Sequence, residues 1–300
     1  MKKKTYLFAL MAMALTLGSC SDNENGIGGE TSKYITVSTS IGNMTRVATD
    51  ANGGQTFEEG DEISVYAWIG APTVAPETRE RVVNNAINKL TNGSWVATPQ
   101  MLWKNNRDKH YFIGVYPTAA ISDLSAGEYT FNETKQVESD LLVAVNKDGL
   151  SYNVDEPQTV PLTFTHVMAK LAVNLTYKNQ WGGIPTVEKV VVGNAAKEAT
   201  INYLTKVVTP STTAKEDFSL PEITENTKYV SVIIPQEEVK QLTIVIGGKN
   251  FVYDNGTPFK LESGKITTVN LEVGRDEIKL GDVKITNWED GSTFSGEALN

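Results

Sequence analysis

Apolar and polar residues alternate along most of the chain from residue 35 onward. In the first such run, Ile35, Val37 and Ile41 share one side. Similar runs lie at residues 63–67, 111–116, 141–145, 160–165, 171–177, 189–192, 230–234, 242–246, 266–273 and 283–286. Asn-Gly, Asp-Gly and Gly-Gly pairs separate many of them. A period of two with such turn residues predicts about a dozen short antiparallel strands, which is typical of β-sandwiches.

Residues 77–90 fit two different elements. Their apolar residues follow helical i, i+3 and i+4 spacing, but three asparagines interrupt the segment. Asn92 and Gly93 then form a turn pair just before Trp95. Such a pair joins the two strands of a hairpin, so we favour a long β-hairpin over a helix here.

A core strand is predicted at residues 164–175. Apolar residues occupy every second position of its later part. The side chains expected to be buried are Phe164, Val167, Leu171, Val173 and Leu175.

The first 20 residues follow a different pattern. Three lysines precede an apolar run at residues 6–17, and Leu-Gly-Ser-Cys closes it at Cys20. This layout is an export signal and is too short for a membrane span. It matches the bacterial lipoprotein box, so we expect residues 1–19 to be removed and Cys20 to carry a lipid anchor that holds the protein to a membrane. The alternative is an ordinary secretory signal with a cysteine there by chance.

Composition narrows the choice of partners. Residues 20–33 are acidic and rich in glycine, which predicts a flexible tether. Without the three lysines of the signal, 24 basic residues face 36 acidic ones, a net charge of −12. That charge argues against binding to nucleic acid or to anionic membrane surfaces. Cys20 is the only cysteine, so its acylation leaves no thiol or disulfide chemistry.

The length after the signal suits two domains rather than one small sandwich. We place an N-terminal β-sandwich domain at residues 34–165 and a C-terminal one at residues 166–300. A Gly-Gly pair and a proline within residues 178–185 mark an alternative boundary.

The sequence carries no recognisable catalytic, cofactor or metal motif. The two histidines, His110 and His166, are far apart, and His166 lies among apolar residues, which favours a position in the core or at an interface. Neither G-x-S-x-G nor a cluster of histidine and cysteine is present. Four tryptophans lie in or beside predicted strands, namely Trp68, Trp95, Trp103 and Trp288. We expect them in the core rather than on a sugar-binding surface, and we expect neither an enzyme nor a bound cofactor.

Several segments occur in an order that resembles a known family. They are Thr45-Arg46, FEEGDEISVYAW at 57–68, Met101-Leu102-Trp103, YFIGVYP at 111–117, FTHVMAKLAVNL at 164–175 and VKITNWEDG at 283–291. Together they resemble the fimbrillin-like proteins of Bacteroidetes, the shaft, tip and anchor subunits of type V pili. The resemblance implies two tandem transthyretin-like β-sandwich domains, export as a lipoprotein, and cleavage by a trypsin-like protease after an arginine. It also implies assembly with other fimbrial subunits by strand exchange.

The residues give this implied mechanism a physical basis. Arg46, followed by Val47, lies in a polar stretch directly after the first strand, where a protease can reach it, although a solvated charge is the alternative. Burying Ile35, Val37 and Ile41 is worth about 5–9 kcal/mol. A whole domain has a net stability of about 5–15 kcal/mol. A domain without this strand keeps an apolar groove with unpaired backbone, which recruits another strand.

The C-terminus offers the best donor strand. Val283 and Ile285 alternate in one phase and Trp288 follows, whereas residues 278 and 280 alternate in the other phase. The break at residues 281–282 predicts a bend or bulge. Two ordinary final strands are the alternative.

The leading hypothesis is therefore a structural fimbrial subunit that supports adhesion at the cell surface. The second is a surface lipoprotein that binds a glycan or a protein and does not polymerise.

Overall fold

The computed structural model describes residues 33–42, 56–153, 158–254 and 256–288. These residues belong to one compact unit. Cys20, Arg46 and Val47 lie outside the described residues, so the predictions for them stay predictions.

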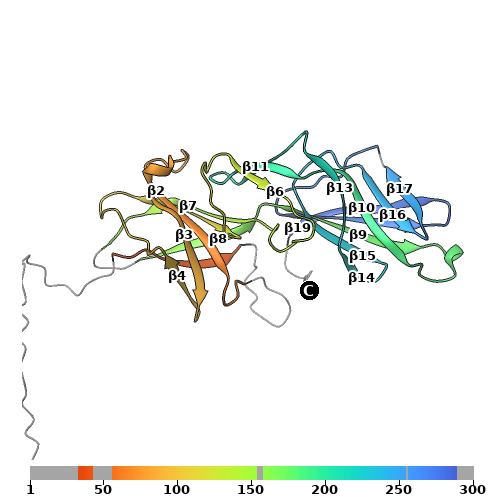
Figure 1. The fold of residues 1–300 in the computed structure, drawn as a ribbon, viewed down its shortest axis with the longest axis horizontal. Helices are drawn as coiled ribbons and strands as arrows, with labels where there is room; N and C mark the ends of the chain where they lie inside the picture. The colour runs from red at the N-terminus through yellow and green to blue at the C-terminus, as the bar shows by residue number, and fades with distance from the viewer. Residues whose placement is uncertain (1–32, 43–55, 154–157, 255, 289–300) are drawn as a thin grey trace, which may run out of the picture. The chain divides into compact units, whose positions relative to one another are not determined.

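The first sheet has seven strands and contains the N-terminal strand at one edge (Figure 1). Its order is β1 (Thr36–Ile41), β8 (Thr159–His166), β7 (Leu142–Leu150), β5 (His110–Tyr116), β2 (Glu62–Ile69), β3 (Arg81–Thr91) and β4 (Ser94–Thr98). β3 and β4 form the long hairpin that the sequence favoured over a helix. Asn92 and Gly93 in its turn have φ angles of 51° and 72°, the left-handed region that an Asn-Gly hairpin turn requires.

The other described strands form three further sheets. One has the order β13 (Lys215–Ser219), β10 (Val187–Ala196), β16 (Gln241–Ile246) and β17 (Lys249–Asp254). Another has the order β12 (Val207–Pro210), β11 (Glu198–Asn202) and β6 (Gly127–Thr130). The last has the order β14 (Glu222–Thr224), β15 (Lys228–Ile233), β9 (Ala169–Tyr177), β18 (Lys265–Val273) and β19 (Ile278–Asn287).

Helical structure in the described residues is confined to two short 3₁₀ turns, Thr78–Glu80 and Asn179–Trp181. The all-β prediction is therefore confirmed. The expected boundary at residues 165–166 falls at the end of β8, and the division into tandem domains stays a prediction. Within the described residues, no helix has the length and apolar character needed to span a membrane.

Two strand pairs are parallel, β1 with β8 and β9 with β18. Alternation along a strand shows which side chains share a face, but both kinds of pairing produce it. Parallel neighbours need a long crossover connection, and more than a hundred residues separate β1 from β8. The remaining pairs in these sheets are antiparallel, so the expected antiparallel arrangement holds except at these two pairs.

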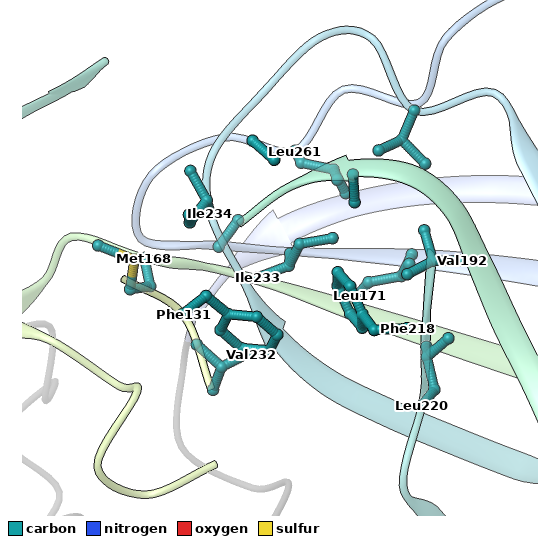
Figure 2. Close-up of a cluster of buried hydrophobic side chains, with 14 of the residues drawn as sticks. Phe131, Met168, Leu171, Val192, Phe218, Leu220, Val232, Ile233, Ile234 and Leu261 are labelled. Carbon is teal, nitrogen blue, oxygen red and sulfur yellow. The ribbon is translucent and has the colours of Figure 1, made fainter. Parts of the chain in front are cut away.

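The five side chains predicted to be core are buried, but the prediction of a single strand over residues 164–175 is wrong. β8 ends at His166 and β9 begins at Ala169, because the chain passes there from the seven-stranded to the five-stranded sheet, a change that alternation does not reveal. Phe164, Val167, Leu171, Val173 and Leu175 are each at most 3% exposed. Figure 2 shows Leu171 in a cluster that also includes Val192 of β10 and Phe218 of β13. The five-stranded and four-stranded sheets therefore contribute to one shared core.

Candidate functional site: the first and last strands

The N-terminal strand β1 is bonded to β8 along its whole length. The register runs from Thr36 opposite Thr159 to Ile41 opposite Phe164. Hydroxyl groups reinforce it on the exposed face, with 3.1 Å between the Oγ1 atoms of Thr36 and Thr159. Beyond the strand, the Gly42 N–H donates to the Phe164 carbonyl at 2.7 Å. β1 is thus a regular member of the sheet, held at its edge.

A second segment holds the start of β1 on its other side. The Ile35 N–H donates to the Met101 carbonyl at 3.0 Å, and the Trp103 N–H donates to the Lys33 carbonyl at 3.2 Å. The Trp95 indole N–H donates to Thr39 Oγ1 at 3.0 Å. Sequence reasoning missed this second partner, although Met101-Leu102-Trp103 stood out as a family segment.

The inner face of β1 fills a separate apolar core. Ile35 is 1% exposed and Val37 6% exposed, whereas Ile41 is only half-buried. Burial of the two fully buried residues is worth about 3–6 kcal/mol, less than the sequence-based figure. Without β1, the apolar side chains beneath Ile35 and Val37 would face water.

Aromatic rings form the floor of this core. The Phe57 ring makes edge contacts with Phe164, Trp95 and Tyr116, at centroid distances of 5.1, 5.3 and 5.4 Å. Gly114 on β5 makes room for Phe164, because a Cβ atom there would lie 2.6 Å from Phe164 Cζ. The rings that line this core therefore come from β4, β5, β8 and the segment before β2, and none of them belongs to β1.

The last strand, β19, also lies at a sheet edge. It pairs with β18 on one side and with no described strand on the other. The register shifts between the pairs Val269–Val283 and Leu271–Leu280, which confirms the predicted irregularity at residues 281–282. Val283 is 39% exposed and Ile285 41% exposed, although both lie opposite buried residues of β18.

Trp288 differs from these two neighbours because it is 5% exposed. Its ring stacks on His166, with centroids 4.1 Å apart and planes 6° from parallel. His166 Nδ1 lies 2.8 Å from Asp140 Oδ1. The prediction that His166 occupies a buried position is confirmed.

A family model described as fimbrillin-like matches residues 45–288. The chain belongs to the fimbrillin-like family. Among curated protein sequences, none matches it. The match covers more than three quarters of the chain and confirms the predicted family.

Solved structures show the same fold. A protein from Bacteroides uniformis assigned to cell adhesion is 17% identical, with a TM-score of 0.64 over 85% of this chain and 98% of the other. A protein from Bacteroides ovatus, also assigned to cell adhesion, is 18% identical, with a TM-score of 0.62 over 85% and 98% of the two chains. A fimbrial protein from Bacteroides vulgatus is 13% identical, with a TM-score of 0.53 over 85% and 99%.

Three of the four tryptophans that were expected in the core of this fimbrillin-like protein are buried there. Trp68, Trp103 and Trp288 are at most 8% exposed, and Trp95 is half-buried with its N–H bonded to Thr39. This confirms the expectation of a core position for Trp68, Trp103 and Trp288, whereas Trp95 only packs against the core from a half-buried position. Among the described residues, no group of three or more His, Cys, Asp or Glu side chains is placed to hold a metal ion.

His110 is the residue whose surroundings the sequence described least well. Charged residues surround it in the chain, yet its side chain is fully buried at the start of β5. Its Nε2 accepts the Lys104 N–H at 3.1 Å, and Nδ1 lies 3.1 Å from the Asp108 carbonyl. Burial lowers the pKa of His110, and the Asp108 carbonyl opposes that shift in part. The neutral ring thus fixes the turn that follows residues 101–103.

The structure does not bring the two candidate strands together in one sheet. β1 lies in the seven-stranded sheet and β19 in the five-stranded sheet.

Proposed function

We propose that the protein is a structural fimbrial subunit that polymerises by strand exchange. In this proposal it is exported as a lipoprotein with Cys20 acylated in the outer membrane. A trypsin-like protease cuts between Arg46 and Val47, β1 leaves, and a donor strand from another subunit takes its place. The observation that carries the proposal is β1 itself, an edge strand whose buried residues fill a groove that the rest of the domain forms.

Energetics support the exchange. While the chain is intact, β1 is present at a very high effective concentration, so an incoming strand gains nothing by competing. After cleavage β1 is held only by hydrogen bonds and by the burial of Ile35 and Val37. A donor that buries similar side chains and restores the backbone bonds then competes on equal terms, and strand addition of this kind is a common mode of recognition.

β19 is the best candidate donor among the described strands. It lies at a sheet edge and alternates apolar with polar residues, and Val283 and Ile285 are only partly covered in its own subunit. Transfer into a neighbour's groove would bury both side chains more deeply. The gain in apolar burial offsets part of the cost of leaving β18.

The family match gives further support at one point. It begins at residue 45, next to Arg46, so β1 lies outside the part of the chain that matches the family model. This is the pattern that a removable leader strand would give. The alternative of a glycan-binding lipoprotein lacks a comparable observation, because three of the tryptophans that would form a sugar platform are buried in the cores and Trp95 is half-buried.

The test is an assembly assay with purified protein and limiting trypsin. Wild-type protein should lose residues up to Arg46 and then form a heat-sensitive ladder on a gel, whereas Arg46→Ala should stay monomeric. Ile285→Asp should fold normally because the side chain is 41% exposed, yet it should block assembly because a charge cannot enter the groove. Val252→Asp on β17, at a site 46% exposed, is the matched control and should assemble normally. Ladders from Arg46→Ala, or unchanged assembly of Ile285→Asp, would contradict the proposal.

A further inference from the structure

The Trp288 side chain packs against the link between β8 of the seven-stranded sheet and β9 of the five-stranded sheet. Besides its stacking contact with His166, the Lys170 ammonium group lies 4.1 Å from the centre of the Trp288 ring. Lys170 is 2% exposed, so this cation–π contact is shielded from water and correspondingly strong. His166 is the last residue of β8 and Lys170 the second residue of β9. The ring therefore packs against both ends of the short link from β8 to β9.

Backbone hydrogen bonds tie the same place together. The Trp288 N–H donates to the Gly264 carbonyl at 3.0 Å, and the Gly264 N–H donates to the Met168 carbonyl at 2.8 Å. Ser263 Oγ donates to the Val167 carbonyl, also at 2.8 Å. The residues just before β18 thus bridge the end of β19 to the link between β8 and β9.

The rest of the second half of β19 lacks comparable burial, and its side-chain hydrogen bonds, from Asn270 to Asp282 and from Lys265 to Asn287, lie on the exposed surface. Residues 281–287 are exposed, and the strand has a paired neighbour on one side only among the described residues. The irregularity opposite residue 270 separates this half from the better-packed residues 278 and 280. The burial that fixes the second half is therefore concentrated in Trp288 at its end.

We propose that Trp288 is a latch that keeps β19 in its own sheet. With the ring seated on His166 and Lys170, the second half of β19 stays paired with β18. When the ring leaves, that half opens while the remaining core stays intact. The role of the latch in restraining a donor strand rests on the proposed function, but the latch itself does not.

The position of the latch links it to the groove of β1. Phe164, which lies opposite Ile41 and accepts the Gly42 N–H, is two residues before His166 on β8. Loss of β1 leaves this end of β8 with β7 as its only paired neighbour among the described strands. A strand that is less firmly held supports the stacked His166 less well, so an empty groove weakens the latch. Coupling of this kind is reciprocal, and the seated ring in turn favours the filled groove.

Hydrogen exchange of the full-length protein, read by mass spectrometry for residues 282–287, tests the latch. Trp288→Ala should speed exchange in this segment by about tenfold or more, the loss expected for a shielded cation–π contact and a ring stack. Exchange in β10 and β16 should not change. Ile285→Ala, in the same strand but exposed, is the matched control and should have little effect.

Two further variants separate the latch from general destabilisation. His166→Ala should open the segment as Trp288→Ala does, whereas His166→Phe keeps a ring for stacking and should stay closer to wild type. If Trp288→Ala does not fold, Trp288→Phe gives the same measurement with an intermediate expected rise. Unchanged exchange in residues 282–287 of either Trp288 variant, or an equal rise in Ile285→Ala, would overturn the proposal.

The assembly assay distinguishes the latch from the function on which its role rests. If the segment opens in Trp288→Ala and trypsin-treated protein assembles faster, the latch restrains the donor strand. If the segment opens and assembly does not change, the latch stands and β19 is not the donor. Cleaved protein freed of β1 should also exchange faster at residues 282–287 than intact protein, and equal rates would refute the coupling.

Discussion

Leu171 represents the buried residues that set the stability of the fold. It lies on β9, the central strand of the five-stranded sheet, and its side chain is fully buried. Leu171→Ala should lower the free energy of unfolding by about 2–5 kcal/mol, because it leaves a cavity in a packed core. Val252→Ala removes apolar atoms from an exposed strand position and serves as the control. A denaturant titration that finds no difference between the two variants would contradict the assigned core.

His110 makes the stability depend on pH. Burial holds its folded-state pKa below the ordinary value of 6.5, so the unfolded chain binds a proton more readily than the folded protein. Its contribution is therefore fully present above pH 6.5 and declines as the pH falls below 6.5 towards the folded-state pKa. The free energy of unfolding should decrease between pH 7 and pH 5, and His110→Gln should flatten that decrease. Parallel curves for the two proteins over this interval would refute the assignment.

Protonation of His110 should also affect the segment that holds the start of β1. His110 packs edge-on against Trp103, with centroids 5.0 Å apart, and Trp103 donates its backbone N–H to Lys33. Protonation would remove the acceptor of the Lys104 N–H and loosen the turn behind this contact. We therefore expect the pH effect to be largest in the segment that holds the start of β1.

At the level of elements, the sequence predicted most of the strands but not their partners. Alternation located these strands because a side-chain period of two is a local property. Six shorter strands lie outside every predicted run, namely β6, β11, β12, β13, β14 and β17. The Asn92-Gly93 pair decided between hairpin and helix because its positive φ angles suit a tight turn. The pairing of β1 with β8, and of β6 with β11, depends on contacts between distant parts of the chain that no local pattern encodes.

In the candidate site, too, local patterns were predictable and contacts between distant parts of the chain were not. Ile35 and Val37 could be assigned to a buried face from their spacing, and the structure places them there. Trp288 was grouped with Val283 and Ile285 because it follows them, yet it alone is buried. Its partners His166 and Lys170 lie more than a hundred residues earlier in the chain, so only the fold could reveal the stacking contact.

For the molecule as a whole, family membership and the position of β1 lead to one account. A fimbrillin-like protein is expected at the cell surface in association with other fimbrial subunits, and its fold matches solved structures of fimbrial and adhesion proteins. The proposed account adds an N-terminal strand that fills a groove until cleavage, and a C-terminal strand held in place by Trp288. Each step uses a different part of the chain, so each can be disabled separately.

The central claim is that assembled subunits have lost β1, and the most direct measurement is the N-terminus of subunits in fimbriae from intact cells. Mass spectrometry of the polymer should find chains that begin at Val47, with no peptide from residues 33–42. The unassembled precursor should still contain that peptide. Polymer whose subunits retain Ile35 and Val37 would contradict the account.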